Sequence, residues 1–225
     1  MPIVVSFVSQ KGGVGKSTLA RALLAVAAHV MKARLADLDP QQASVLAWER
    51  TRVRRRSGPA CEVVGYGSIG EALADSDDIE LLIIDTAAGT NRATLDVARR
   101  SHLIVQPTGA SADDLVPAVL TFHELIKAGI AKERLVVAIC RVLSPGEVET
   151  VRAYVQDAGY EALEGAIFEK IGYREAQNRG QAITETKVAK LNSEADALIE
   201  AMLYKIAGEV KRLKDAKKAK RRTAS

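Results

Sequence analysis

Gln10-Lys11-Gly12-Gly13-Val14-Gly15-Lys16-Ser17-Thr18 directly follows the apolar run Ile3–Val8 and decides the fold. Its end, Gly15-Lys16-Ser17, matches the G-x-x-x-x-G-K-[ST] phosphate-binding loop, which joins a strand to a helix. The position that ordinarily holds the first glycine of that motif carries Gln10, and Lys11 follows it. The stretch therefore predicts a phosphate-binding loop with one additional lysine.

The glycines of this loop indicate how an anion would be held. Gly12, Gly13 and Gly15 lack a Cβ, so successive backbone N–H groups can turn inward around a phosphate, and the following helix adds its positive end. We expect Lys16 to reach the β- and γ-phosphates and the Ser17 hydroxyl to bind Mg²⁺. The alternative is a glycine-rich turn that binds nothing, which the order strand, loop, helix disfavours.

The composition is that of a single folded domain. A length of 225 residues with 48% hydrophobic content excludes a disordered or fibrous chain. No signal-peptide pattern opens the chain, and no apolar run reaches about 18 residues, so we expect a cytoplasmic protein. Cys61 and Cys140 lie in apolar runs outside any CxxC pair, which favours buried thiols over metal ligands.

The net charge of +4 is unevenly distributed. Residues 205–225 carry nine basic side chains against Glu209 and Asp215, a local charge of +7, which leaves −3 for the preceding chain. A second basic cluster consists of Arg50, Arg52, Arg54, Arg55 and Arg56. Basic patches on a mildly acidic body indicate a polyanionic partner, although a solvated end that maintains solubility is the alternative.

Short apolar runs alternate with helical patterns along the chain. The expected buried strands are Ile3–Val8, Leu35–Leu38, Cys61–Val64, Leu81–Ile84, Leu103–Val105 and Leu135–Ile139. The expected crossover helices are Lys16–Met31, Ala43–Arg55, Ala112–Lys127 and Glu147–Ala158. This alternation predicts an α/β fold with a doubly wound, mainly parallel sheet flanked by helices, as in P-loop NTPases.

The C-terminal region predicts a final amphipathic helix that carries a basic end. Ser193 with Asp196 three residues later is typical of a helix start. Apolar residues then recur at intervals of three and four up to Leu213, so one helix face should pack on the body. We expect a single ATPase domain over residues 1–214 and a basic, flexible tail over residues 215–225.

Two acidic motifs follow predicted strands. The strand Leu81–Ile84 ends in Asp85, with Gly89 beyond it, as expected for a Walker B carboxylate that positions magnesium or its water. Asp37 and Asp39 alternate with Leu38, so both carboxylates can lie on one face of a strand end near the phosphates. Each motif alone could equally be a turn or a helix cap.

Together these motifs resemble the ParA/MinD group of deviant Walker A ATPases, specifically its compact, ParF-like type without an N-terminal helix-turn-helix domain. The resemblance covers nearly the whole chain. Its motifs are the phosphate loop, the sequence Asp37-Leu38-Asp39-Pro40-Gln41, the Asp85 strand, Val105-Gln106-Pro107-Thr108 and the segment Ile171–Ala176 leading to Gly180.

The resemblance implies three catalytic residues. Lys11 would cross a dimer interface to the phosphates of ATP on the other subunit, Lys16 would contact the phosphates in its own subunit, and Asp39 would orient the attacking water. Nucleotide would be bound by Gly12, Gly13, Val14, Gly15, Lys16, Ser17, Thr18 and Asp85. Magnesium would be held by Ser17, Asp39 and Asp85, the last acting through water. Hydrolysis would then depend on dimerisation and would be slow.

The chain departs from the family pattern in small ways. Ser17-Thr18 replaces the commoner Thr-Thr pair and keeps the hydroxyl, and Ala87-Ala88 replaces the usual Pro-Pro after Walker B. No Asn-Lys-x-Asp guanine-reading motif is present, so ATP is the expected nucleotide. Arg141 and the loop to Pro145 are a positional expectation for the surroundings of the base.

The resemblance implies a DNA-partitioning ATPase. Its ATP-bound homodimer would bind DNA without sequence preference and associate with the nucleoid, and a ParB-like partner would stimulate hydrolysis. Besides the tail, the expected DNA contacts are Lys170, Arg174, Arg179, Lys187 and Lys190.

Three other functions were weighed against DNA partitioning. A MinD-like membrane switch is disfavoured because residues 214–225 contain no large apolar side chain, so stable membrane insertion is not expected. A redox ATPase with paired cysteines is disfavoured because only Cys140 follows Walker B. A positioner of a non-DNA cargo shares every motif and stays open.

Overall fold

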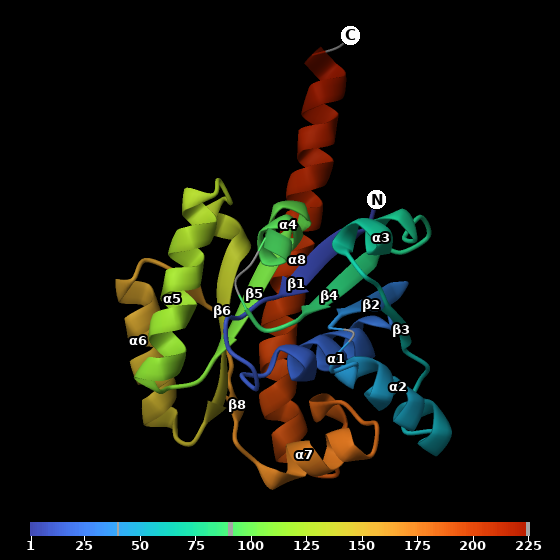
Figure 1. The fold of residues 1–225 in the computed structure, drawn as a ribbon, viewed down its shortest axis with the longest axis vertical. Helices are drawn as coiled ribbons and strands as arrows, with labels where there is room; N and C mark the ends of the chain where they lie inside the picture. The colour runs from blue at the N-terminus through green and yellow to red at the C-terminus, as the bar shows by residue number, and fades with distance from the viewer. Residues whose placement is uncertain (40, 90–91, 224–225) are drawn as a thin grey trace.

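The computed structural model describes residues 1–39, 41–89 and 92–223, apart from the side chains of residues 214 and 216–223. The strands are β1 (Ile3–Phe7), β2 (Ala33–Leu38), β3 (Glu62–Gly65), β4 (Leu81–Thr86), β5 (Leu103–Thr108), β6 (Leu135–Val142), β7 (Glu161–Ala162) and β8 (Ile167–Phe168). The helices are α1 (Lys16–Ala27), α2 (Ser44–Arg55), α3 (Ile69–Ala74), α4 (Arg92–Arg100), α5 (Ala112–Lys127), α6 (Pro145–Asp157), α7 (Ile171–Asn178) and α8 (Ala189–Thr223). Two short 3₁₀ helices, η1 (Lys132–Arg134) and η2 (Ile183–Glu185), complete the order shown in Figure 1.

The strands form one sheet in the order β3-β2-β4-β1-β5-β6-β7, with β8 paired to β6. Every described pairing is parallel. The predicted α/β, mainly parallel, P-loop NTPase-like class is therefore confirmed. Because β1 lies between β4 and β5, the loop that follows β1 emerges at the carboxyl edge of the sheet beside the ends of both neighbours.

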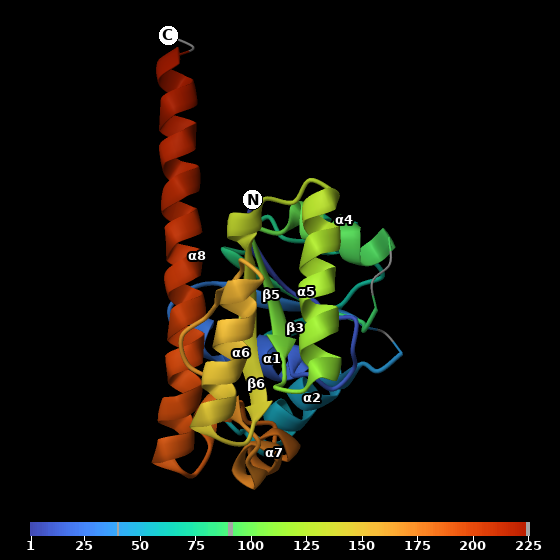
Figure 2. The ribbon, with the colours of Figure 1, turned by 90° about the vertical axis from the view of Figure 1, so that its left-hand side faces the viewer.

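Helices cover both faces of the sheet, as a parallel sheet requires. On one face α1, α2 and α8 pack on strand residues such as Phe7 and Ile83. On the other face α3, α4, α5 and α6 pack on residues such as Ile104 and Ile84. Figure 2 shows α8 on the opposite side of the sheet from α4 and α5. Cys61 and Cys140 are both buried, as expected.

The last helix begins earlier than the sequence predicted. Ser193 is an exposed residue inside α8, which starts at Ala189. The reason is a turn closed by Asn192, whose side-chain oxygen accepts from the Thr186 backbone N–H at 2.8 Å and whose amide donates to the Thr186 carbonyl at 3.0 Å. That turn orders the chain before Ser193, so the expected cap is not used.

Beyond its start, α8 follows the predicted pattern. Its stripe is buried at Ala195, Leu198, Ile199, Met202 and Ile206. The helix then extends past the body to Thr223 (Figures 1 and 2). The division into an ATPase domain over residues 1–214 and a flexible tail over residues 215–225 stays a prediction. In the described part of the chain, none of the helices is long and apolar enough to cross a membrane.

The other expected elements are close to the observed ones. Helix α5 has the predicted bounds, whereas α1 ends at Ala27 instead of Met31. Helix α6 starts at Pro145 because the Ser144 hydroxyl caps it, accepting from the Glu147 N–H at 3.3 Å. The sequence reasoning did not predict α3 and α4 or the two-residue strands β7 and β8, which are too short to give a clear periodicity.

The arginine cluster on α2 is not a uniform surface patch. Arg52 is 1% exposed and pairs with Glu185, its Nη1 and Nη2 atoms lying 2.6 and 2.7 Å from the carboxylate oxygens. It also donates to the Gly180 carbonyl at 3.1 Å and stacks over Trp48. Arg52 therefore joins α2 to the segment after α7. The other four arginines of the cluster are exposed.

Candidate functional site

The loop between β1 and α1 has the backbone of an anion cradle. Gly13 and Gly15 have φ values of +75° and +115°, in the left-handed region that favours glycine. A Cβ on Gly15 would also lie 3.5 Å from Cys140, whereas a Cβ on Gly12 would meet nothing within 4 Å. Two of the three predicted glycines are thus required by conformation, and the loop leads into the N-terminus of α1.

The two loop lysines occupy different environments. Lys16 is buried, and its Nζ donates to the Lys11 carbonyl at 3.3 Å. Burial lowers the pKa of Lys16, an effect that Asp85 and Asp39 partly oppose. Lys11 points away from this position: its side chain is 40% exposed and its Nζ lies 3.3 Å from Asp114 Oδ1 at the start of α5. Only Lys16 therefore faces the phosphate position of its own chain.

Two carboxylates lie side by side at the edge of the sheet. Asp37 at the end of β2 is in register with Asp85 on β4, and both are 2% exposed. Burial raises the pKa of Asp85 to about 6, although a hydrogen bond with the Ser17 side chain opposes the shift. Burial also raises the pKa of Asp37. Asp37 Oδ2 and Asp85 Oδ1 are buried and have no hydrogen-bond partner among the residues that the structure describes.

These unpartnered oxygens fit a hydrated magnesium ion. Asp85 and Ser17 are adjacent, and carboxylate and hydroxyl oxygens are the ligands that Mg²⁺ takes. Among the described residues, no three His, Cys, Asp or Glu side chains converge as a complete metal cage. A divalent ion here would need phosphate and water oxygens as well, the arrangement usual for nucleotide-bound magnesium.

Asp39 lies at the mouth of the site. Its backbone N–H donates to Asp37 Oδ1 at 3.0 Å, and its Oδ1 accepts from the Gln42 N–H at 3.3 Å. These bonds hold the loop after β2 so that Asp37 faces the interior and Asp39 the opening. The next residue of the motif, Pro40, lies outside the described residues.

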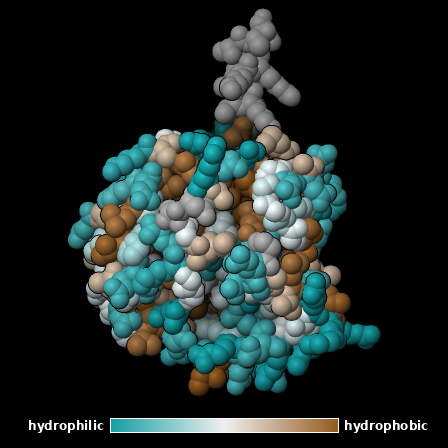
Figure 3. Space-filling model, viewed as in Figure 1, coloured by the Kyte–Doolittle hydropathy of each residue, from teal (hydrophilic) through white to brown (hydrophobic). Residues whose placement is uncertain are grey.

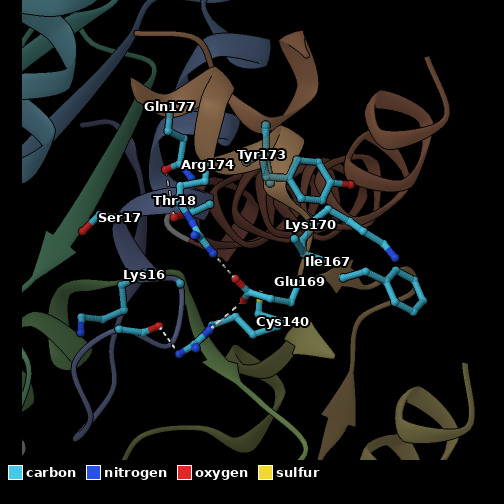
Figure 4. Close-up of a pocket in the computed structure, with 15 residues that line it drawn as sticks. Lys16, Ser17, Thr18, Cys140, Ile167, Glu169, Lys170, Tyr173, Arg174 and Gln177 are labelled. Carbon is cyan, nitrogen blue, oxygen red and sulfur yellow. Dashed lines mark hydrogen bonds and ion pairs between the residues drawn. The ribbon is translucent and has the colours of Figure 1, made fainter. Parts of the chain in front are cut away.

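Two cavities meet at the phosphate loop. The first, of 290 Å³, runs from Lys16 and Thr18 to β8 and α7 (Figure 4). The second, of 510 Å³, lies between Lys16, Asp39 and Thr86. Both are lined by Gly13, Lys16 and Ser17. The loop residues therefore form a wall that the two cavities share.

The structure brings most of the predicted residues together. Gly13, Gly15, Lys16, Ser17 and Thr18 line the first cavity, and Gly12 and Asp39 line the second. Val14 is buried beneath the loop, and Asp85 lies beside Ser17. Lys11 is the residue that lies apart. The individual roles of these residues stay predictions.

Sequence reasoning missed several residues of the first cavity. Gln177 Oε1 accepts from Thr18 Oγ1 and from Arg21 Nη1, each at 3.1 Å. Glu169 lies between Arg141 and Arg174, 3.1 Å from each (Figure 4). No local sequence pattern predicts that Gln177 or Glu169 lines this cavity, because each contacts residues that are distant in sequence.

Arg141 was expected near the base, and it does line this cavity, whereas Pro145 does not. Its φ of +58° is unusual for a residue with a side chain. In this conformation its Nη1 donates to the Gly13 carbonyl at 3.0 Å and its Nε donates to Glu169. Arg141 thus ties the phosphate loop to the segment after β8.

Comparisons with known proteins agree with this geometry. The family model "CobQ/CobB/MinD/ParA nucleotide binding domain" matches residues 5–222. A curated relative, the maintenance of carboxysome distribution protein A of Gloeobacter kilaueensis, is 26% identical over 197 residues, which cover 87% of this chain and 90% of the relative.

Two solved structures share the fold. The MinD cell division protein of Aquifex aeolicus has a TM-score of 0.69 at 18% identity, covering 89% of this chain and 97% of its own. A plasmid partition protein of Borrelia burgdorferi bound to AMPPNP has a TM-score of 0.71 at 16% identity, covering 91% and 100%. At these identities the structural likeness establishes the fold alone.

Proposed function

The chain belongs to the CobQ/CobB/MinD/ParA nucleotide-binding family, and from this premise we propose that it is a ParA-type ATPase that partitions plasmid or chromosomal DNA. It acts as a switch: ATP binding drives formation of a homodimer, the dimer binds DNA without sequence preference, and a ParB-like partner stimulates hydrolysis. The observation that carries this proposal is the separation of the two lysines, because Lys16 faces its own phosphate cavity while Lys11 is partly exposed outside it.

The proposed chemistry follows from the charges around the loop. Lys16 and the backbone N–H groups of Gly13 and Gly15 bind the phosphates, and Asp39 at the cavity mouth orients a water for attack. Magnesium, when bound at Ser17 and Asp85, neutralises the charge that develops on the phosphate oxygens. Since positioning and charge stabilisation account for most of phosphoryl-transfer catalysis, a second lysine delivered from a partner chain would raise the rate only in the dimer.

Only some of the basic residues expected to contact DNA lack an ion-pair partner in the described part of the chain. Within the described side chains, Arg174, Arg179, Lys205 and Arg212 already form ion pairs with Glu169, Glu175, Glu161 and Glu209. Lys187, Lys190 and Lys211 are exposed and form no such pair in the described part. The basic side chains of residues 214 and 216–223 lie outside the description. The proposed DNA contacts are therefore Lys187, Lys211 and the end of α8, whereas Lys190 lines an apolar recess.

The positioning of a non-DNA cargo is the second candidate. It is favoured by the carboxysome distribution relative, whose name describes the placement of a protein body. A MinD-like membrane switch would share the ATPase chemistry as well. All three candidates predict nucleotide-dependent dimers, so the ligand of the dimer distinguishes them.

A gel-shift titration of duplex DNA with Mg-ATP, Mg-ADP and no nucleotide, repeated over a salt series, tests the proposal. DNA binding is expected only with ATP, and the affinity should fall steeply with salt because phosphate neutralisation releases counterions. Equal retardation in all nucleotide states would contradict the switch. Absence of retardation by an ATP-bound dimer would favour the non-DNA cargo.

A further inference from the structure

A third cavity lies where the residues just before α7 meet the first turns of α8. It has a volume of 420 Å³, and its apolar lining comes from Leu143, Pro145, Phe168 and Leu191. The elements around it are tightly packed: a Cβ on Gly172 would lie 2.6 Å from Leu191 Cδ1, and the Tyr173 hydroxyl donates to the Leu191 carbonyl at 2.8 Å. This recess, called the α7–α8 groove below, is therefore built by packed elements.

Exposed apolar side chains surround the α7–α8 groove. Leu143 on its wall is 69% exposed, Ile171, which follows the lining residue Lys170, is 71% exposed, and Val188, two residues before the lining residue Lys190, is 50% exposed. Figure 3 shows apolar side chains at the lower edge of the molecule, the end at which α7 lies in Figure 1. Large apolar side chains gathered at the rim of a recess are typical of an interaction site.

The polar lining of the groove is mainly basic. Lys170 and Lys190 line it, and Lys170 Nζ lies 5.9 Å from the centre of the Phe168 ring. Neither lysine forms an ion pair with the described residues. Glu194 also lines the groove, and its carboxylate lies close to the Tyr173 hydroxyl, so it helps to raise the pKa of that hydroxyl. The groove therefore offers two cations that have no ion-pair partner among the described residues.

We propose that the α7–α8 groove docks a partner protein through a short segment in which a large apolar side chain is flanked by acidic residues. The apolar side chain fills the space between Phe168 and Leu191, and the acidic residues pair with Lys170 and Lys190. Apolar anchors in pockets supply most of the affinity of such contacts, and the charges supply specificity.

The shape and chemistry of the groove favour a protein segment over other polyanions. A DNA backbone carries no large apolar side chain and would gain nothing from the apolar lining. A lipid bilayer takes up protruding side chains, whereas Phe168 and Leu191 are only partly exposed within a recess.

The groove also adjoins the nucleotide cavity. Phe168 and Lys170 line both spaces. A nucleotide that repositions either side chain must change the affinity for the segment, and the segment must change nucleotide affinity by the same factor. This coupling between nucleotide and segment binding rests on the proposed function, whereas docking of the segment does not require that function.

The experiment uses the full chain and a displayed library of random peptides about twelve residues long, selected without nucleotide and with Mg-AMPPNP. Enriched peptides are then titrated by fluorescence anisotropy against the parent, Leu143→Asp, Lys190→Glu and the control Leu120→Asp. Leu120 is an exposed leucine on α5, 50% exposed, away from the groove. Circular dichroism confirms that each variant is folded.

Enrichment of acid-flanked apolar peptides whose affinity falls at least about tenfold in both groove variants, but not in Leu120→Asp, is the expected result. The proposal is overturned if no such pattern is enriched, or if both groove variants bind like the parent. It is also overturned if Leu143→Asp instead abolishes cosedimentation with phosphatidylglycerol vesicles. Fluorescent-ATP binding to the same samples distinguishes failure of peptide docking from failure of the proposed ATPase function. A chain that binds ATP but no peptide contradicts only docking in the α7–α8 groove. A chain that binds peptide but no ATP contradicts only the ATPase function.

Discussion

Lys11 Nζ lies 3.3 Å from Asp114 Oδ1, so the lysine that distinguishes this phosphate loop is paired with the first turn of α5 of its own chain. Asp114 Oδ2 also accepts from the Ser111 hydroxyl at 2.9 Å, which fixes the carboxylate. If Lys11 acts on a second subunit, this ion pair must break first. The pair then opposes dimerisation.

The substitution Asp114→Asn should strengthen the ATP-dependent dimer. Both partners are partly exposed, so each pair is worth only about 0.2–1 kcal/mol. Because a dimer must break two such pairs, its dissociation constant should fall about two- to thirtyfold. Sedimentation velocity with Mg-ATP measures this, with the neighbouring Asp113→Asn as control. A weaker dimer in Asp114→Asn would show that Asp114 assists assembly instead.

The substitution Asp39→Ala should separate binding from hydrolysis. Asp39 lines the second cavity, and among the described residues its carboxylate accepts a hydrogen bond from the Gln42 N–H alone, so its loss should leave ATP affinity and dimer formation near those of the parent. ATP turnover should fall by about 10²-fold or more. Gln42→Ala, on the same loop, is the control. Normal turnover by an Asp39→Ala dimer would remove the water-orienting role.

The substitution Asp85→Asn should stabilise the unliganded chain at neutral pH. The pKa of Asp85 is raised from 3.8 to about 6, so the folded state binds more protons than the unfolded state between these values and its stability falls as pH rises. Above about pH 7 the ionised carboxylate costs at most roughly 3 kcal/mol. Urea unfolding should show a gain in the variant near pH 8 that disappears near pH 4. An equal gain at both pH values would contradict this account.

The substitution Arg52→Ala should destabilise the fold strongly. It leaves Glu185 and the Gly180 carbonyl without their buried partner, a loss of about 3–5 kcal/mol in the free energy of unfolding. Arg54→Ala, an exposed residue on the same helix, should change it by less than about 0.5 kcal/mol. Chemical denaturation compares them, and similar effects of both would contradict a structural role specific to Arg52.

The parts of the fold and of the candidate site that could be predicted from the sequence are those encoded by neighbouring residues. The phosphate loop, the strand ends at Asp37 and Asp85, and the bounds of α5 all follow from short-range chemistry, because turns, strands and helices are encoded by neighbouring residues. The burial of Arg52 was not predictable, because its partner Glu185 is 133 residues away. The bond between Thr18 and Gln177 joins residues 159 apart for the same reason. The arginine cluster thus predicted an exposed basic surface, whereas one of its members, Arg52, is buried in the fold.

Lys11 is proposed to couple ATP binding to assembly. Sedimentation velocity of the parent and Lys11→Ala with Mg-ATP measures this coupling, after fluorescent-ATP titration has shown that both chains bind nucleotide. We expect ATP to shift the parent to twice its 24.1 kDa mass while Lys11→Ala stays monomeric. A Lys11→Ala chain that binds ATP and dimerises like the parent would contradict it.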